Sequence, residues 1–161
     1  MNRTHLMPHT RQLLFALLTL VLFSCEKDDI CVDGDSAILV IEFRDATDKE
    51  SLKPVSGLSV LLNDTPYQGI ENQSVSKLEL ALSATQKNYI FHFVQGESTL
   101  SDQLEMRVTP TITYVSRACG YVLEFEGLSI QPLDTLDWIS STEVLTETVT
   151  ATNEPHLVIY H

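Results

Sequence analysis

Hydrophobic and polar residues alternate in short runs along most of this chain, and turn-forming residues separate the runs. The clearest run is 103–109, where three apolar residues alternate with Glu105 and Arg107. Because successive side chains of a strand point to opposite faces of a sheet, this alternation predicts a strand that is buried on one face only. Pro110 follows the run, and we expect it to end the strand because proline has no backbone N–H to donate.

Eight further runs have the same character, so the pattern predicts an all-β domain. Short strands separated by turn residues are typical of an Ig-like or related β-sandwich of about 7–9 antiparallel strands. A helical spacing occurs only weakly, at Leu133, Leu136 and Ile139, and we expect at most one short helix there. The eight runs cover residues 37–44, 58–62, 75–82, 89–94, 111–116, 120–125, 143–150 and 157–160.

The first 24 residues differ from the rest of the chain. Arg3 and Arg11 precede the apolar run 13–23, and the segment contains no acidic residue. This order is typical of a secretory signal peptide. The apolar run is shorter than the roughly 20 residues that a membrane-spanning helix needs. We therefore interpret residues 1–24 as a signal peptide.

The end of this segment predicts lipid attachment. Leu22, Phe23, Ser24 and Cys25 resemble a lipobox, in which the cysteine receives diacylglycerol. The alternative is an ordinary secretory cleavage site, but such a site has small residues at both flanking positions, and Leu22 fits that pattern poorly. We expect cleavage before Cys25 and a lipid on its sulfur, which anchors the protein to the membrane.

Residues 25–36 are acidic and lack an apolar period, so they predict a solvated tether before a domain at 37–161. Within the tether, residues 27–29 resemble the acidic signal that directs Bacteroidetes-type lipoproteins to the cell surface. A calcium loop is the alternative for this segment, but the required ligand spacing with a distal glutamate is absent. The carboxylates concerned are those of Asp28, Asp29, Asp33 and Asp35.

The charge of the chain excludes one class of partner. After removal of residues 1–24, eight basic residues face 22 acidic ones, which gives a net charge of −14. Nucleic acids bind proteins through lysine and arginine, so we expect no nucleic-acid partner. An anionic membrane surface also repels such a body, so anchoring must come from the acyl chains.

Counting the cysteines favours one disulfide. Once Cys25 carries the lipid, Cys31 and Cys119 form an even pair in an oxidising compartment. A bridge between them closes a loop of roughly 90 residues, which stabilises the fold by about 4–5 kcal/mol on the chain-entropy model. The alternative is that Cys119 is a reactive thiol activated by Arg117, but no histidine lies in a recognisable signature with it.

No sequence motif indicates catalysis, a cofactor or a metal site. The chain lacks clustered histidines and carboxylates, a nucleophile elbow and a phosphate-binding glycine loop. His92 lies inside an apolar run, and we interpret it as a packed or edge histidine. Two carboxylates that converge from distant strands could still form a carbohydrate hydrolase site, and this enzyme is the alternative function.

Two short patterns suggest modification. Ser36 and Thr135 each follow an aspartate and precede an apolar residue, as in the O-glycosylation acceptors found in Bacteroidetes. We retain both hydroxyls as candidate acceptors.

Four segments together resemble a known group of proteins. They are SCEKDDIC at 24–31, AILVIEF at 37–43, KPVSGL at 53–58 and VSRACGY at 115–121. They are similar to an uncharacterised Bacteroidetes lipoprotein family that is catalogued as a domain of unknown function. The resemblance supports the pairing of Cys31 with Cys119 and implies no activity. It suggests partnership with an outer-membrane β-barrel.

These observations lead to one expectation about function. We expect a lipid-anchored protein of the outer membrane, on its periplasmic face or at the cell surface. Its domain acts as a non-catalytic binding or structural accessory module that docks an envelope partner, through an edge strand for example.

Overall fold

The structure, a computed structural model, describes residues 31, 36–67, 69–96 and 101–161. The chain divides into two compact units, Met1–Ile30 and Cys31–His161, and every described residue belongs to the second unit. The predicted signal peptide, Cys25 and most of the predicted tether lie outside the described residues. Within the described part of the chain, no helix is long and apolar enough to cross a membrane.

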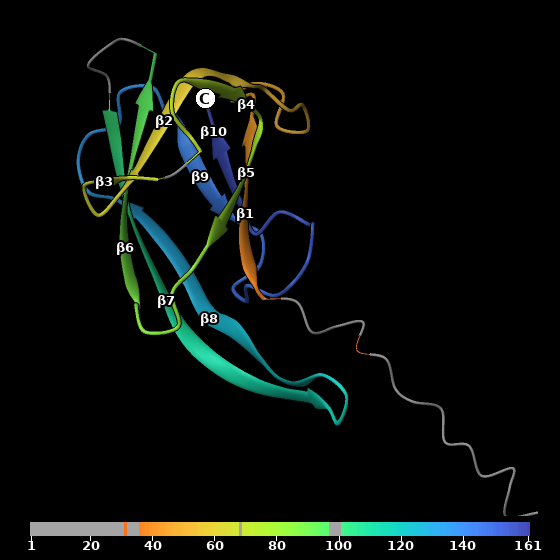
Figure 1. Cartoon of the computed structure of the whole chain (residues 1–161). Helices are drawn as coiled ribbons and strands as arrows, with labels where there is room; N and C mark the ends of the chain where they lie inside the picture. The colour runs from red at the N-terminus through yellow and green to blue at the C-terminus, as the bar shows by residue number, and fades with distance from the viewer. Residues whose placement is uncertain (1–30, 32–35, 68, 97–100) are drawn as a thin grey trace, which may run out of the picture. The chain divides into compact units, whose positions relative to one another are not determined.

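The described residues form ten strands in two sheets and no helix, as Figure 1 shows. This arrangement confirms the predicted all-β class and is consistent with a β-sandwich. Sheet A contains, in spatial order, β5 (Lys77–Ala81), β1 (Ile38–Arg44), β10 (Leu157–Tyr160) and β9 (Ser141–Val144). Sheet B contains β3 (Thr65–Pro66), β2 (Val55–Leu62), β6 (Asn88–Gln95), β7 (Ser101–Ser116) and β8 (Gly120–Pro132), and β4 (Gln73–Val75) also pairs with β2.

One pair of strands runs parallel, in contrast to the antiparallel sandwich that we expected. β1 and β10 are parallel neighbours, with Ile41 beside Leu157 and Phe43 beside Ile159. The other ladders among the described strands are antiparallel. All four residues of β10 are buried, and an apolar run without alternation is typical of a strand that is covered on both faces.

The inward-facing residues of the two sheets form one hydrophobic core. Ile41 and Phe43 of β1 are fully buried, as are Phe91 and Phe93 of β6. The rings of Phe43 and Phe93 meet edge to face, with centroids 6.3 Å apart, and so connect sheet A to sheet B. The predicted alternation of these two runs therefore identifies core positions correctly.

Pro110 does not end its strand, so that prediction is wrong. β7 runs through it to Ser116 and is 16 residues long in total. Pro110 lies opposite Phe125, whose backbone N–H and C=O both bond to Val149 on the other side of β8. The pair is therefore one of the non-hydrogen-bonded pairs of the β7–β8 ladder. A missing N–H removes no ladder hydrogen bond at such a position, so proline is tolerated.

The predicted strand 143–150 is divided between the two sheets. β9 ends at Val144 in sheet A. The chain then reaches sheet B, where Val149 forms an isolated bridge with Phe125 and is fully buried. A hydrophobic pattern records that a residue is buried but not which sheet it joins, so the two short segments read as one.

The segment after β8, where the helical spacing is weak, forms no helix, because a buried carboxylate holds it in another conformation. Asp102 of β7 is 1% exposed and accepts backbone N–H groups from Asp137, Trp138 and Ile139 at 2.6, 3.1 and 2.7 Å. The indole N–H of Trp138 also donates to the Phe93 carbonyl at 3.1 Å. These bonds give the backbone N–H groups of residues 137–139 acceptors without helical hydrogen bonds, and they place Ile139 in the core.

Candidate docking site

β7 and β8 continue past the sandwich as a two-stranded arm, visible in Figure 1 as the long hairpin that leaves the two sheets. β6 pairs with β7 only as far as Arg107. On the other side, Val149 bridges to Phe125 of β8. We call residues 111–124 the arm, because among the described strands its two halves pair only with each other. Isolated ribbons of this kind are marginally stable, so the arm depends on support at its ends.

A bulge at Gly127 sets the side-chain orientation in the β8 half of the arm. β8 uses one more residue than β7 between two neighbouring rungs of the ladder. Gly127 has φ 68°, a conformation that glycine adopts without a Cβ clash. The extra residue reverses the alternation, so Phe125 and Leu128 are both buried. Leu123 and Tyr121 therefore lie on the same face of the ribbon as the core residue Phe125.

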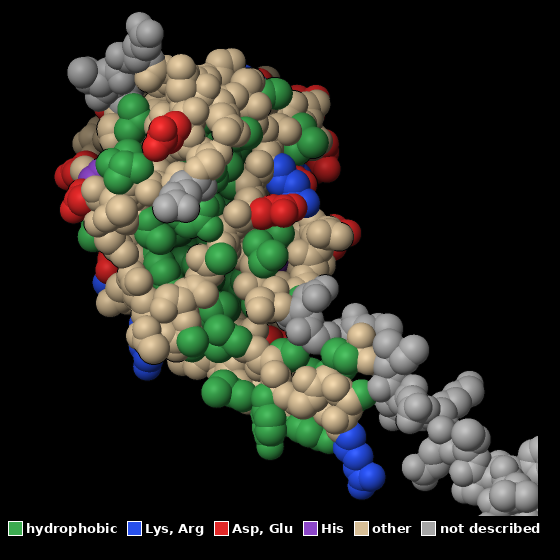
Figure 2. All heavy atoms as spheres, in the orientation of Figure 1, with side chains coloured by type: hydrophobic (Ala, Val, Ile, Leu, Met, Phe, Trp, Pro, Cys, Tyr) green, Lys and Arg blue, Asp and Glu red, His purple; other side chains and the backbone are tan. Residues whose placement is uncertain are grey.

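One face of the arm is apolar. Ile112 lies opposite Leu123, and Tyr114 lies opposite Tyr121, so the four side chains share a face. Ile112 and Tyr121 are each 72% exposed and Tyr114 is 55% exposed. In Figure 2 hydrophobic side chains follow the border of the arm that points away from the sandwich. Adjacent large apolar residues with this exposure make the face a candidate interaction surface.

The opposite face of the arm is more polar. Thr111 pairs with Glu124, and Thr113 pairs with Val122. The Thr113 hydroxyl donates to the Glu124 carboxylate at 2.7 Å across the ribbon. The arm is therefore amphipathic. On its apolar face Leu123 packs against the core, whereas Ile112, Tyr114 and Tyr121 are exposed.

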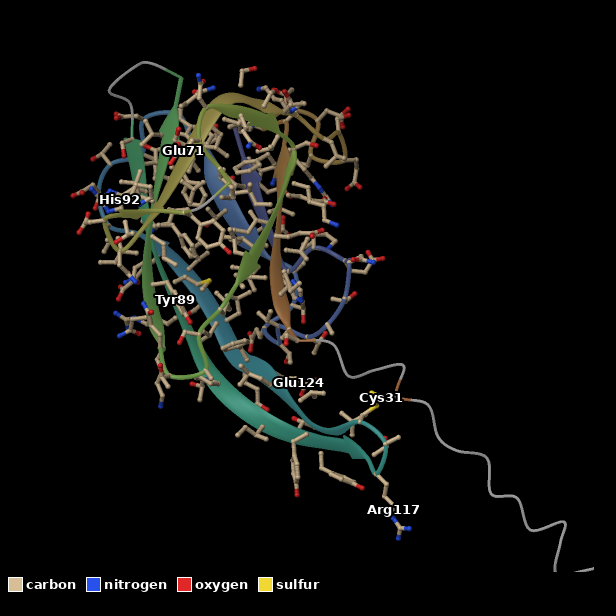
Figure 3. The ribbon with its side chains drawn as sticks, in the orientation of Figure 1. Cys31, Glu71, Tyr89, His92, Arg117 and Glu124 are labelled. Atoms are coloured by element: carbon tan, nitrogen blue, oxygen red, sulfur yellow. A yellow bond between two sulfur atoms is a disulfide. The ribbon has the colours of Figure 1, made fainter. Side chains whose placement is uncertain are left out.

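The tip of the arm carries a cation and a cysteine. Gly120, with φ 70°, closes the turn opposite Ser116. The Cys119 N–H donates to the Ser116 hydroxyl at 3.0 Å, which fixes the cysteine in the turn. Arg117 is exposed at the end of the arm, as Figure 3 shows.

A disulfide connects this tip to the segment before β1. Cys31 and Cys119 are bonded to each other, with a Cα–Cα distance of 4.8 Å and a sequence separation of 88 residues. The structure thus contains the bridge that the cysteine count favours. Because the Cys119 sulfur is part of a disulfide, the alternative of a free reactive thiol is not supported.

Both edges of the arm are open. Hydrogen-bonded and non-hydrogen-bonded pairs alternate along an antiparallel ladder. Since Pro110–Phe125 is a non-hydrogen-bonded pair, Ile112–Leu123 and Tyr114–Tyr121 are too. Their backbone N–H and C=O groups point out of the ribbon, where no described strand pairs with them. Such an edge can accept an added strand from a partner.

The two candidate glycosylation sites are accessible. Ser36 is exposed ahead of β1, and Thr135 is exposed in the segment after β8. A glycosylating enzyme needs an exposed hydroxyl, and both residues meet this condition. Their glycosylation stays a prediction. They lie on different segments from the disulfide and form no common site with it.

The histidines have structural contacts. His92 Nε2 lies 3.4 Å from the exposed Asp64 carboxylate, and Figure 3 places His92 on the sandwich, away from the arm tip. His156 is fully buried, and its Nδ1 accepts the Val40 N–H at 3.1 Å. Burial lowers the pKa of His156 below its usual value, which favours the neutral ring. The His161 ring packs edge-on against Trp138.

One cavity on the described part of the sandwich has a volume of about 440 Å³ and is lined, among the described residues, by Leu62, Thr65, Pro66 and Tyr67. No acidic residue or histidine belongs to this lining. No group of three or more histidines, cysteines or carboxylates in the described part of the chain could hold a metal ion. The carbohydrate hydrolase stays a prediction without a located site.

Comparison with protein families places the chain in one of them. A model described as a family of unknown function matches residues 56–161, which is more than half of the chain and includes the whole arm. The chain belongs to the DUF6452 family. No curated protein and no solved structure matches the chain. The predicted membership of a family of unknown function is confirmed, whereas a lipoprotein nature or a bacterial group is not part of this match.

The arm of this DUF6452 protein is the candidate site that sequence reasoning missed. Both of its strands were expected, at 111–116 and 120–125, and only three residues separate them. Large apolar residues on matching faces of two strands so close together could have indicated a hairpin. Their exposure could not be foreseen, because it depends on where the neighbouring strands end.

Proposed function

We propose that this DUF6452 protein is a lipid-anchored lipoprotein of the outer membrane and that its sandwich is a non-catalytic docking module. The signal-like segment 1–24 and the lipobox ending in Cys25 support the anchor. The family match assigns no activity, so the proposal depends on the anchor and on the arm.

The disulfide is the observation that carries the proposal. It joins the arm tip at Cys119 to Cys31, and six peptide units separate Cys31 from Cys25. A fully extended chain of that length reaches about 20 Å. A lipid on Cys25 therefore keeps the tip of the arm close to the membrane surface. Any partner that the arm meets is then in the membrane or beside it.

The open edges of the arm supply the docking mode. An extended segment of a partner can pair with the outward-pointing backbone groups at Tyr114 or Leu123. Main-chain pairing of this kind needs no catalytic residue and no deep cavity. A membrane-associated envelope protein with a free strand is the partner that this arrangement favours.

Cell fractionation tests the anchor. In wild-type cells we expect the mature protein in the membrane fraction, with the mass of a diacylglyceryl group on its N-terminal peptide. A Cys25→Ala variant should lose both. Cys31→Ala is the matched control, because it removes a nearby cysteine but leaves the lipobox intact. A Cys25→Ala protein that stays in the membrane fraction would refute the anchor.

Photo-crosslinking in intact cells tests the docking surface. A photoreactive amino acid at Thr113, on the polar face of the arm, should give a discrete adduct with one membrane-associated protein. The same amino acid at Ile90, which is 37% exposed on sheet B, is the control. An identical adduct from both positions, or none from position 113, would contradict docking by the arm.

A further inference from the structure

We infer that the apolar face of the arm rests on the lipid surface of the membrane, so that the arm is a second, non-covalent membrane contact beside the acyl anchor. This inference rests on the proposed lipid at Cys25. It assigns the apolar face to lipid and leaves the two backbone edges free for a protein.

The covalent path between lipid and arm limits where the arm can be. Cys119 is bonded to Cys31, and the six peptide units from Cys31 back to Cys25 span about 20 Å at most. A hydrocarbon core with its headgroup regions is about 40–45 Å thick, so this tether is shorter than the membrane. The tip of the arm must therefore stay within reach of the headgroups.

The side chains of the apolar face suit a membrane interface. Tyr114 and Tyr121 form a cross-strand pair, with ring centroids 5.3 Å apart, and Ile112 follows them on the same face. Tyrosine is enriched at membrane–water interfaces, where its ring lies among the headgroups and its hydroxyl stays hydrated.

The charge along the arm also favours a lipid surface. No acidic residue occurs between Glu105 and Glu124, although the whole chain has 22 acids and a net charge of −12. That stretch carries two cations, Arg107 near the root and Arg117 at the exposed tip. Glu124 is directed to the polar face, where it accepts the hydroxyl of Thr113. The apolar face is thus free of the charge that would repel anionic headgroups.

The direction of the apolar face agrees with this placement. In Figure 2 several hydrophobic side chains lie along the border of the arm away from the sandwich, with a basic side chain at the end. A membrane that touches this border leaves the acidic sandwich on the other side of the arm. Long arginine side chains at an interface keep their charge among the headgroups while their stems cover apolar surface.

The test uses the full lipidated protein in vesicles of phosphatidylethanolamine and phosphatidylglycerol, so that no other protein is present. An environment-sensitive fluorescent amino acid replaces Ile112 in one variant and Thr113 in a second. These neighbours lie on opposite faces of the same strand. Ile112 is 72% exposed on the apolar face, and the Thr113 hydroxyl bonds to Glu124 on the polar face. Vesicle flotation and the intact mass of the protein first establish that it carries its lipid.

We expect the probe at 112 to shift its emission to the blue in vesicles and to lose intensity when the vesicles contain doxyl-labelled lipids. The probe at 113 should show neither change. Equal exposure of both probes to water would overturn the inference while leaving the anchor intact, because flotation reports the anchor separately. A blue shift at 112 without quenching by doxyl lipids would assign the face to a second copy, which also overturns it. Absence of an acyl mass would refute the anchor and this inference together.

Discussion

Tyr114 and Tyr121 lie directly opposite each other on the β7–β8 arm, with their ring centroids 5.3 Å apart, and yet both are largely exposed. An edge-to-face aromatic pair contributes about 0.5–1.5 kcal/mol beyond its buried area. This contribution stabilises the arm and not the sandwich, because neither tyrosine belongs to the hydrophobic core.

Because this pair is exposed, we expect its replacement to weaken the contact that the arm makes but not the stability of the sandwich. Replacing both tyrosines by serine should change the melting temperature of the sandwich little, since exposed side chains contribute little to folding. It should weaken whatever contact the arm makes, measured by the vesicle and crosslinking experiments. Tyr89→Ser is the contrasting variant, because Tyr89 is 1% exposed and stacks on Phe91. It should cost about 3–5 kcal/mol of unfolding free energy.

The disulfide should stabilise the domain against unfolding. Without it, we expect the free energy of unfolding to fall by up to about 4–5 kcal/mol, the chain-entropy value for a loop of this size. Urea denaturation of a protein with both Cys31→Ser and Cys119→Ser measures the loss. Wild-type protein in reductant is the control and should match the variant. Equal midpoints for the variant and the oxidised wild type would show that the bridge contributes nothing.

Asp102 should be the most sensitive acidic residue of the described sandwich. A buried N–H left without an acceptor costs about 1–3 kcal/mol. Asp102→Ala leaves the buried N–H of Ile139 and the partly buried N–H groups of Asp137 and Trp138 without their acceptor. Asp102→Asn keeps one acceptor oxygen and should lose less. Asp134→Ala, at an exposed position, should be nearly neutral. Denaturation midpoints should follow this order, and a destabilised Asp134→Ala with an unaffected Asp102→Ala would contradict it.

Acidification should destabilise the fold through His156. Burial holds the pKa of His156 below the usual 6.5, so the unfolded chain binds a proton more readily than the folded one. The stability is therefore complete above pH 6.5 and declines as the pH falls through that value toward the folded pKa. A charged ring would also present a donor at Nδ1 to the Val40 N–H.

Unfolding midpoints at about pH 5 and about pH 7.5 measure this effect, because only an imidazole group titrates in that interval with an unperturbed pKa. Replacing His156 by asparagine, which retains an acceptor for Val40, should flatten the difference. His92→Asn is the control at the domain surface and should preserve it. A pH dependence that survives the loss of His156 would assign it to other groups.

Two proline substitutions test the ladder of the arm. The N–H of Thr111 lies in a hydrogen-bonded pair with Glu124, so Thr111→Pro should break the ladder and expose the arm amides to exchange. The N–H of Ile112 points out of the ribbon, because Ile112, like Pro110, lies in a non-hydrogen-bonded pair. Ile112→Pro should therefore be tolerated. Hydrogen exchange of the Val122 amide distinguishes the two. Similar loss of protection in both variants would refute the assigned pair type.

The sequence was sufficient to predict the fold class because burial on alternate residues is a local property. Leu104, Met106 and Val108 show it, and all three are buried. The sequence also supports the pairing of Cys31 with Cys119, since removal of one cysteine from three leaves only one combination. Neither inference requires knowledge of which strands are neighbours.

The features that escaped prediction all depend on non-local pairing. Pro110 is tolerated because the N–H and C=O of Phe125, the residue opposite it, bond to Val149 and not to β7. Asp102 reads as an ordinary polar residue until the segment at Asp137 folds over it. The arm is exposed only because β6 stops pairing at Arg107. Each of these facts joins residues that are distant in the chain, where composition and periodicity carry no information.

The parallel pairing of β1 with β10 has a consequence for the order of folding. β10 is the only described strand between β1 and β9, so sheet A cannot close until residues 157–160 have joined strands that come far earlier in the chain. Contacts of such large sequence separation must overcome loop-closure entropy first and form slowly. Among the described strands, sheet A is therefore complete only when the last one, β10, has taken its place between β1 and β9.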